Sequence, residues 1–284
     1  MSSSVTLKNR PSSRRHHYIP TFYLRQWALG DGCICQFSRP HDRVVAKRKH
    51  PEAAGYMDDL YSVDGAPREI KSYVEDHFLA RTDQLAHDAL QCFLNGQLDL
   101  SDDLRSGWTR FVMSLLQRTP QKIAWLLDNW NRDMDVKVGP EKTVARAITT
   151  MQMLQSVMDL PQTGTKINGM TWNVAYYADA RFNLLTSDRP VIMSNGLLKP
   201  ESYVIVPIGP ERLFVAANSE SFVNQLKSLD SQQLISTCNN TIALQAHTYV
   251  YGEDDSQARF VENRLGRGKP QLIVSDIGSA SISA

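Results

Sequence analysis

The chain has 284 residues, which suits one large domain or two small ones and is long enough to bury a substantial core. Its apolar fraction of 42% and charged fraction of 21% are ordinary for a globular protein, and no apolar run reaches the roughly 18 residues of a membrane span. The net charge of +1 provides no bulk attraction to nucleic acid, so such a partner would need a local basic patch. We expect no membrane partner, and the oligomeric state stays open.

The N-terminus is rich in serine and basic residues and lacks the apolar core of a secretory signal, so residues 1–13 are predicted to be a disordered leader. Four cysteines occur without the spacing of a metal site, which favours reduced thiols in a cytoplasmic protein. Basic residues suited to a local patch, or simply to a solvated surface, are Lys8, Arg10, Arg14, Arg15, Lys47, Arg48 and Lys49.

Residues 14–25, RRHHYIPTFYLR, combine imidazoles, guanidiniums and phenols around a proline. Imidazole titrates near neutral pH and guanidinium binds phosphate and carboxylate, so this segment is more typical of a polar site than of a core. Adjacent side chains of an extended chain point in opposite directions. Only one of His16 and His17 can therefore face a given pocket easily, and the sequence does not tell which.

The predicted elements begin with a short helix from Pro20 to about Leu29 and a hairpin of strands 33–38 and 44–48. Apolar residues then recur at threes and fours, which predicts a helical block over about 69–160. Short β-rich runs bounded by turn residues follow and predict one sheet, accompanied by helices. The predicted runs are strands 171–177, 182–186, 191–193, 204–208, 213–217 and 248–251, and helices 219–227, 231–245 and 254–265.

The expected fold class is therefore α+β, with an N-terminal hairpin, a C-terminal mixed sheet and a helical block between them. We expect a single domain over residues 14–268, followed by a loose Gly- and Ser-rich tail at 269–284.

Further polar candidates lie outside the opening segment. Ser187, Asp188 and Arg189 follow an apolar strand and have two interpretations: a cleft site in which Arg189 holds an anion, or a tight turn closed by side-chain-to-backbone bonds. Glu75 lies on a predicted helix and Arg118 ends another before Thr119-Pro120. Each of these two is either a buried structural anchor or part of a polar pocket.

The sequence resembles a bacterial family built on a domain of unknown function, over about residues 14–251. The resemblance implies that the polar segments belong to one site, but it supplies no reaction. It is carried by the His-His-Tyr-Ile-Pro-x-Phe-Tyr-Leu-Arg signature from His16 to Arg25, by Tyr61, Glu75 and Arg118-Thr119-Pro120, by Thr186-Ser187-Asp188-Arg189-Pro190, by Val206-Pro207-Ile208-Gly209-Pro210, and by Asn239 or Asn240 before Tyr-Val-Tyr.

The leading hypothesis is a phosphodiester hydrolase, nuclease-like, of a bacterial defence or toxin-like system, acting on nucleic acid. In this hypothesis His16 or His17 is the general base or a metal ligand, and Asp188 orients the histidine or binds a divalent metal. The substrate-binding residues are Arg25, Glu75, Arg118, Ser187 and Arg189. The alternatives are a non-catalytic module that binds a small ligand or a protein through the same pocket, and a purely structural clamp.

Overall fold

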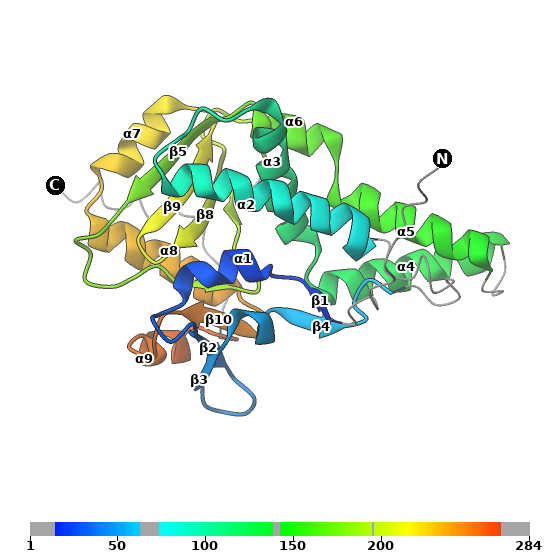
Figure 1. Cartoon of the computed structure of the whole chain (residues 1–284), viewed down its shortest axis with the longest axis horizontal. Helices are drawn as coiled ribbons and strands as arrows, with labels where there is room; N and C mark the ends of the chain where they lie inside the picture. Colours follow the sequence, from blue (N-terminus) through cyan, green and yellow to red (C-terminus); the bar gives the residue numbers. More distant parts are fainter. Residues whose placement is uncertain (1–14, 63–73, 139–142, 195, 268–284) are drawn as a thin grey trace, which may run out of the picture.

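The computed structural model describes residues 15–62, 74–138, 143–194 and 196–267 (Figure 1). It confirms the α+β class: N-terminal strands, a central set of helices and C-terminal strands follow one another along the chain. The predicted leader and tail lie outside the described residues, and the division into one domain with two ends stays a prediction. No helix in the described ranges is long and apolar enough to cross a membrane.

Most of the α-helices lie in the middle of the chain, between residues 80 and 168. Short 3₁₀ turns at Arg25–Trp27 and Pro51–Ala53 and a π-helical turn at Val74–Leu79 accompany them. The α-helices are α1 (Thr21–Leu24), α2 (Ala80–Leu94), α3 (Asp102–Gln117), α4 (Pro120–Val138), α5 (Val144–Met158), α6 (Pro161–Asn168), α7 (Glu220–Ser228), α8 (Ser231–Gln245) and α9 (Ala258–Glu262).

Among the described residues, the strands form one two-stranded and two four-stranded sheets, ordered β1-β4, β3-β2-β10-β6 and β5-β9-β8-β7. Every strand pairing between them is antiparallel. The strands are β1 (Arg15–His17), β2 (Ile34–Ser38), β3 (Val45–Lys49), β4 (Tyr56–Asp58), β5 (Thr171–Tyr176), β6 (Thr186–Ser187), β7 (Ile192–Met193), β8 (Tyr203–Gly209), β9 (Arg212–Ala217) and β10 (Tyr249–Gly252).

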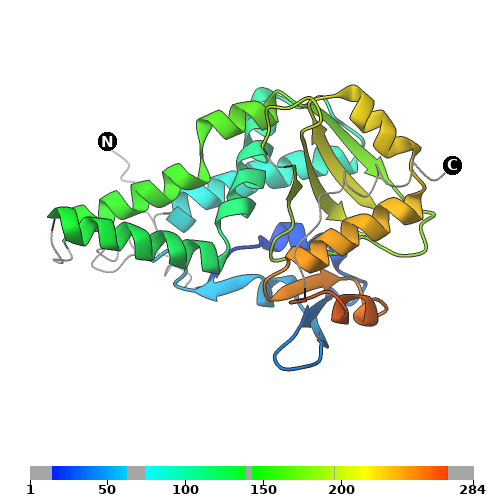
Figure 2. The same cartoon turned by 180° about the vertical axis from the view of Figure 1, so that it is seen from behind.

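The sheet β5-β9-β8-β7 lies between two layers of helices, with α2 and α3 on one face and α7 and α8 on the other (Figures 1 and 2). Alternate residues of β8 therefore enter different cores: Val204 and Val206 pack with the α2–α3 side, whereas Tyr203 and Ile205 pack with the α7–α8 side. This two-sided burial explains why β8 and β9 read as continuous apolar runs.

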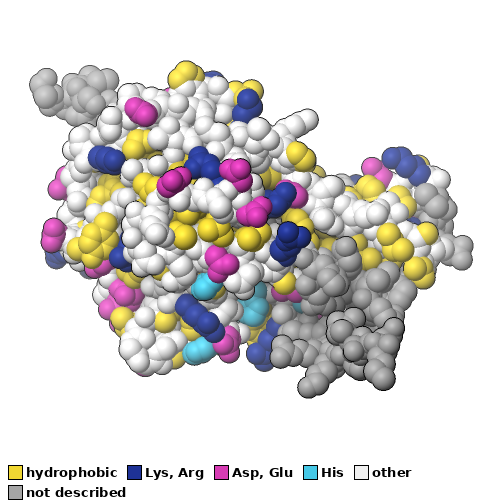
Figure 3. All heavy atoms as spheres, turned by 45° about the horizontal axis from the view of Figure 1, so that its top comes forward, with side chains coloured by type: hydrophobic (Ala, Val, Ile, Leu, Met, Phe, Trp, Pro, Cys, Tyr) yellow, Lys and Arg dark blue, Asp and Glu magenta, His cyan; other side chains and the backbone are white. Residues whose placement is uncertain are grey.

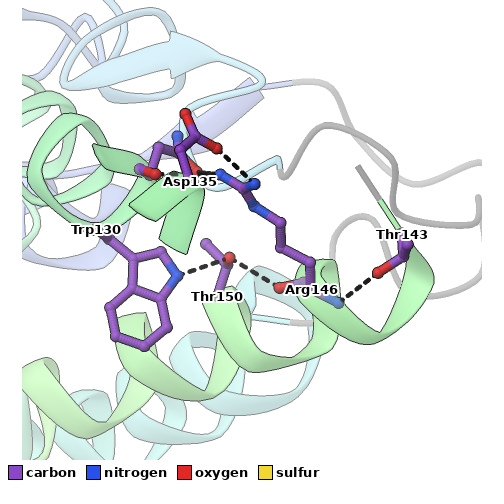
Figure 4. A network of polar contacts seen from close by, with 6 residues as sticks. Trp130, Asp135, Thr143, Arg146 and Thr150 are labelled. Carbon is purple, nitrogen blue, oxygen red and sulfur yellow. Dashed lines mark hydrogen bonds and ion pairs between the residues drawn. The ribbon is translucent and has the colours of Figure 1, made fainter. Parts of the chain in front are cut away.

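Helices α4 and α5 project from the body as an arm (Figures 1 and 2). A polar network joins them, shown in Figure 4. The Trp130 indole donates to the Thr150 hydroxyl at 2.9 Å, and the Arg146 guanidinium pairs with Asp135 at 2.6 Å. These contacts hold the arm together where few other elements cover it.

Three expectations about the C-terminal half need correction. The strand runs do not form one sheet, because β6 pairs with β10, which in turn pairs with the N-terminal hairpin β2–β3. The sheet expected to be mixed has only antiparallel pairings among its described strands, since consecutive strands such as β8 and β9 are joined by a tight turn. The helices extend beyond the predicted block, which ended at about residue 160, because residues 161–168 form α6 with Pro161 in its first turn.

Candidate functional site

The opening segment begins with β1, which pairs with β4. This pairing places His16 opposite Met57 and His17 opposite Tyr56. The Gly55 carbonyl then accepts the backbone N–H groups of Tyr18 and Ile19 at 2.9 and 3.0 Å. The strand geometry sends the two histidine side chains to opposite faces, as expected from the sequence.

His16 is a structural anchor in this arrangement. Its side chain is 1% exposed, and its Nδ1 accepts the backbone N–H of Tyr61 at 3.0 Å. The imidazole also stacks on the Tyr61 ring with 5.5 Å between centroids. An Nδ1 that accepts a hydrogen bond carries no proton, so these contacts hold His16 in a defined neutral form.

His17 has a different environment. The residue is half-buried, yet its Nε2 is buried and has no hydrogen-bond partner among the described residues. Burial lowers the pKa of His17 below its ordinary value of 6.5, against the effect of a hydrogen bond with the Glu52 backbone, and the Arg118 charge adds to the lowering. The imidazole is therefore neutral at pH 7, with a ring nitrogen that no neighbouring group occupies.

Arg118 is fully buried at the end of α3. Its Nη1 contacts both carboxylate oxygens of Asp83, at 3.0 and 3.3 Å, while its guanidinium carbon lies 5.4 Å from the centroid of the Phe111 ring. Its Nε and Nη2 are buried without a hydrogen-bond partner in the part of the chain that the structure describes. Burial raises the pKa of Asp83 against the opposing influence of Arg118. A buried guanidinium with two unsatisfied nitrogens is costly, because desolvation of these N–H groups is not repaid.

Tyr61 connects these groups. Its hydroxyl donates to the Arg118 carbonyl at 3.4 Å. Burial raises its pKa, and among the nearby charges Arg118 opposes this while Glu75 and Asp83 add to it. Glu75 belongs to the π-helical turn that precedes α2, a local geometry that is frequent at functional sites. We name His17, Tyr61, Glu75, Asp83 and Arg118 the Arg118 cluster.

Asp188 is 4% exposed and closes a turn. Its Oδ1 accepts the backbone N–H of His247 at 2.8 Å, and its Oδ2 accepts those of Thr248 and Tyr249 at 2.6 and 3.0 Å. Burial raises the pKa of Asp188, and these three bonds oppose that shift. The carboxylate thus fixes the entry into β10 through bonds to a distant segment, whereas the local turn interpretation of residues 187–189 is supported only by the bond from the Arg189 N–H to the Ser187 hydroxyl.

Tyr18 lies between the Arg118 cluster and Asp188. Burial raises the pKa of Tyr18, and the charge of Asp188 adds to that effect. Tyr18 in turn contributes to the raised pKa of Tyr61. Tyr18 thus feels the charge of Asp188 and acts on Tyr61 beside Arg118, whereas Arg25 and Arg189 are exposed; the assignment of all the polar segments to one site stays a prediction.

The same region contains a purely structural junction. The Tyr23 hydroxyl donates to the Pro207 carbonyl at 2.6 Å and lies 2.8 Å from the Thr186 hydroxyl. The Trp27 indole donates to the Leu184 carbonyl at 2.7 Å. These bonds dock the opening segment onto both four-stranded sheets.

The remaining predicted residues lie at the periphery. Arg25 is on the surface, where its 56% exposed side chain pairs with Glu52 at 2.9 Å. The Ser187 hydroxyl is buried and accepts the backbone N–H of Arg189 at 3.1 Å. The Arg189 side chain is exposed and lines a surface pocket with Lys122. The catalytic and binding roles assigned to all these residues stay predictions.

Two further features bear on the predicted partners: the grouping of metal-ligating side chains in the described residues, and the charge pattern on the face drawn in Figure 3. Within the described residues, no three His, Cys, Asp or Glu side chains are grouped closely enough to hold a metal ion, so the predicted divalent metal has no evident ligand set there. Basic and acidic side chains alternate on the face shown in Figure 3, which carries no extended basic surface.

Sequence reasoning missed Asp83 and Lys122. Asp83 occupies a position on the buried side of α2, close in sequence to Thr82 and Ala86, which are buried. A carboxylate at such a position needs a buried partner, so the helical periodicity itself was the available signal. Lys122 lies in the first turn of α4, beyond the break that follows Arg118, and had no comparable signal.

The comparisons with known proteins identify a family. A family model described as a protein of unknown function, DUF4238, matches residues 15–256. The chain belongs to this family, which confirms the resemblance to a domain of unknown function, while the motifs quoted for that resemblance stay predictions. No curated protein and no solved structure matches the chain.

Proposed function

We propose that this protein is a nuclease-like phosphodiester hydrolase of a bacterial, cytoplasmic defence or toxin-like system, with the Arg118 cluster as its active site. The observation that carries the proposal is the set of unsatisfied nitrogens there: Nε and Nη2 of Arg118 and Nε2 of His17. A non-bridging phosphate oxygen is the acceptor that a guanidinium fork fits.

The chemistry follows from the two side chains. Neutral His17 accepts the proton of the attacking oxygen, either of water or of a ribose hydroxyl, as that oxygen forms its bond to phosphorus. The Nε and Nη2 groups of Arg118 donate to the non-bridging oxygens and stabilise the charge that develops on them. Protonated His17 then returns the proton to the leaving oxygen as its bond to phosphorus breaks. Because Arg118 is fully buried, substrate entry requires that the contacts covering it open.

The test is cleavage of labelled RNA and DNA by the purified chain, with and without Mg²⁺, Mn²⁺ or Zn²⁺. We expect His17→Ala to lower the rate by about 100-fold or more, the usual contribution of a general base. Arg118→Lys keeps the charge but removes the fork, and we expect a similar loss. His41→Ala is the matched control, since His41 is exposed on the β2–β3 turn.

The proposal fails if both nucleic acids stay intact under every metal condition and His17→Ala changes nothing in cells. A second candidate is favoured by the contacts of His16 and Asp188, which bind backbone N–H groups and so leave His17 Nε2 as the buried histidine nitrogen without a hydrogen-bond partner in the described part of the chain. This candidate is a binding module that holds an anionic ligand at Arg118 without turnover. For this candidate we expect a nucleotide or another anionic metabolite to raise the melting temperature of the protein without being converted to a product.

A further inference from the structure

A surface pocket of about 350 Å³ lies outside the Arg118 cluster, and none of its lining residues belongs to that cluster. It is formed where the end of α3, the first turn of α4, the β6–β7 loop and the last residue of α8 meet. Its volume is in the range typical of small-ligand sites. The lining residues are Leu115, Leu116, Thr119, Lys122, Arg189, Val191 and Gln245.

Two cations face this pocket without a counter-charge in its lining. Lys122 and Arg189 form no ion pair within the described part of the chain, and no carboxylate lines the pocket. Burial and, secondarily, the Arg189 charge lower the pKa of Lys122, which indicates that the two cations lie within reach of each other. Asp188 is next to Arg189 in sequence, but its carboxylate binds backbone N–H groups. An anion placed between the two cations would relieve their repulsion.

The pocket is held in shape by the protein itself. The Gln245 amide donates to the Val191 carbonyl at 3.1 Å and to the Arg189 carbonyl. Lys122 Nζ donates to the Leu116 carbonyl at the end of α3 at 3.4 Å. These contacts fix the loop that carries Arg189 and orient Lys122 before any ligand arrives, which lowers the entropy lost on binding.

Beside the polar residues Thr119 and Gln245, three apolar side chains line the pocket. Leu115, Leu116 and Val191 contribute no polar side-chain atom, so a bare inorganic anion would leave this area unused. A ligand that combines an anionic group with an apolar or aromatic body fits both halves.

We infer that this pocket binds a phosphate monoester carrying an aromatic group, the chemistry of a mononucleotide. Lys122 and Arg189 hold the phosphate, and Leu115, Leu116 and Val191 contact the base. This binding activity goes beyond the proposed hydrolase, because it rests on residues outside the Arg118 cluster.

The test is calorimetric titration of the whole chain with 5′-AMP, adenosine and inorganic phosphate. We expect 5′-AMP to bind more tightly than either fragment, and Lys122→Gln and Arg189→Gln each to weaken it about tenfold, the loss typical of one charge-assisted hydrogen bond. Lys137→Gln is the matched control, since Lys137 is an exposed lysine near the other end of α4. The affinity should also fall as salt is added.

The inference is overturned if 5′-AMP does not bind, if both variants bind it as the wild type does, or if adenosine or phosphate alone binds as tightly. The experiments can reject the pocket and the proposed hydrolase independently of each other. His17→Ala should abolish cleavage and leave 5′-AMP binding unchanged. Loss of 5′-AMP binding in Lys122→Gln, in a protein that cleaves no nucleic acid, would support the pocket and reject the hydrolase.

Discussion

The Arg118 cluster and the Asp188 turn are both buried and charged, and they differ in how their polar atoms are satisfied. Asp188 directs both carboxylate oxygens at three backbone N–H groups. Arg118 satisfies only Nη1, through Asp83, and leaves Nε and Nη2 without partners. A buried group whose bonds are complete stabilises the fold, whereas one with unused donors retains capacity to bind a ligand. This difference supports a structural role for Asp188 and is the reason why the proposed active site is placed at Arg118.

The largest expected effect comes from breaking the ion pair in the Arg118 cluster. Arg118→Met leaves Asp83 without its buried partner, and we expect the free energy of unfolding to fall by about 3–5 kcal/mol. Urea denaturation followed by circular dichroism measures it. Adding Asp83→Asn should restore part of the loss, and Arg132→Met, at an exposed site, should cost little. A full loss in the double variant would contradict the pairing.

The next largest effect tests the structural role of Asp188. Asp188→Asn replaces a carboxylate acceptor by an amide that cannot accept at both positions, and we expect a loss of about 2–3 kcal/mol in unfolding free energy. Binding of 5′-AMP and any cleavage should persist under conditions in which the variant is folded. Asp179→Asn, at an exposed site, is the control. A stable variant that has lost cleavage would move Asp188 into the active site.

A smaller loss is expected at the junction of the opening segment. Tyr23→Phe removes the hydroxyl that bonds to Pro207 and contacts Thr186, leaving buried acceptors unpaired. We expect the free energy of unfolding to fall by about 1–2 kcal/mol, measured by thermal and urea unfolding. Tyr176→Phe, on an exposed tyrosine, should be nearly neutral. Equal effects of the two variants would mean that the junction contributes nothing specific.

The smallest effect is a pH dependence. The lowered pKa of His17 means that the unfolded chain binds this proton more readily than the folded chain. The contribution of the buried, neutral His17 to the free energy of unfolding is therefore fully present above pH 6.5. It is lost as the pH falls from 6.5 through the lower pKa that His17 has in the folded state. Arg118, Glu52 and Arg15 are the charges that act on this imidazole. His17→Phe should flatten the fall in stability below pH 6.5, and an unchanged profile would show that His17 is not desolvated.

Much of the local structure could be predicted from the sequence, because local signals determine it. The hairpin β2–β3, the strand β5 and the helix α8 follow their apolar patterns, and Ser101 caps α3 by accepting the Leu104 N–H at 3.4 Å. The opposite orientations of His16 and His17 followed from strand geometry alone. The partition of the strands between sheets could not be predicted, because β6 joins β10 through only two residue pairs, which no sequence period encodes.

The sequence singled out every member of the Arg118 cluster except Asp83, but it did not predict their contacts. Arg118 and Glu75 were singled out as groups that could be buried, but the pairing of Arg118 with Asp83 depends on the close approach of α2 and α3. Gly107 permits that approach, since a Cβ there would lie 2.4 Å from the Leu85 Cβ. Such a contact between two helices leaves no local signature in the sequence.

The bonds from Tyr23 to Thr186 and Pro207 join positions 163 and 184 residues apart, and β2 pairs with a strand that ends at Gly252. During synthesis, Tyr23 and the hairpin β2–β3 therefore leave the ribosome well before Thr186, Pro207 and β10, and the hydrogen bonds between them cannot close until those later residues have emerged. Until then the Tyr23 hydroxyl, the Trp27 indole and the β2 edge that pairs with β10 stay exposed to solvent. The Arg118 cluster draws only on residues 17–118, so its members have all emerged before the sheet onto which the opening segment docks.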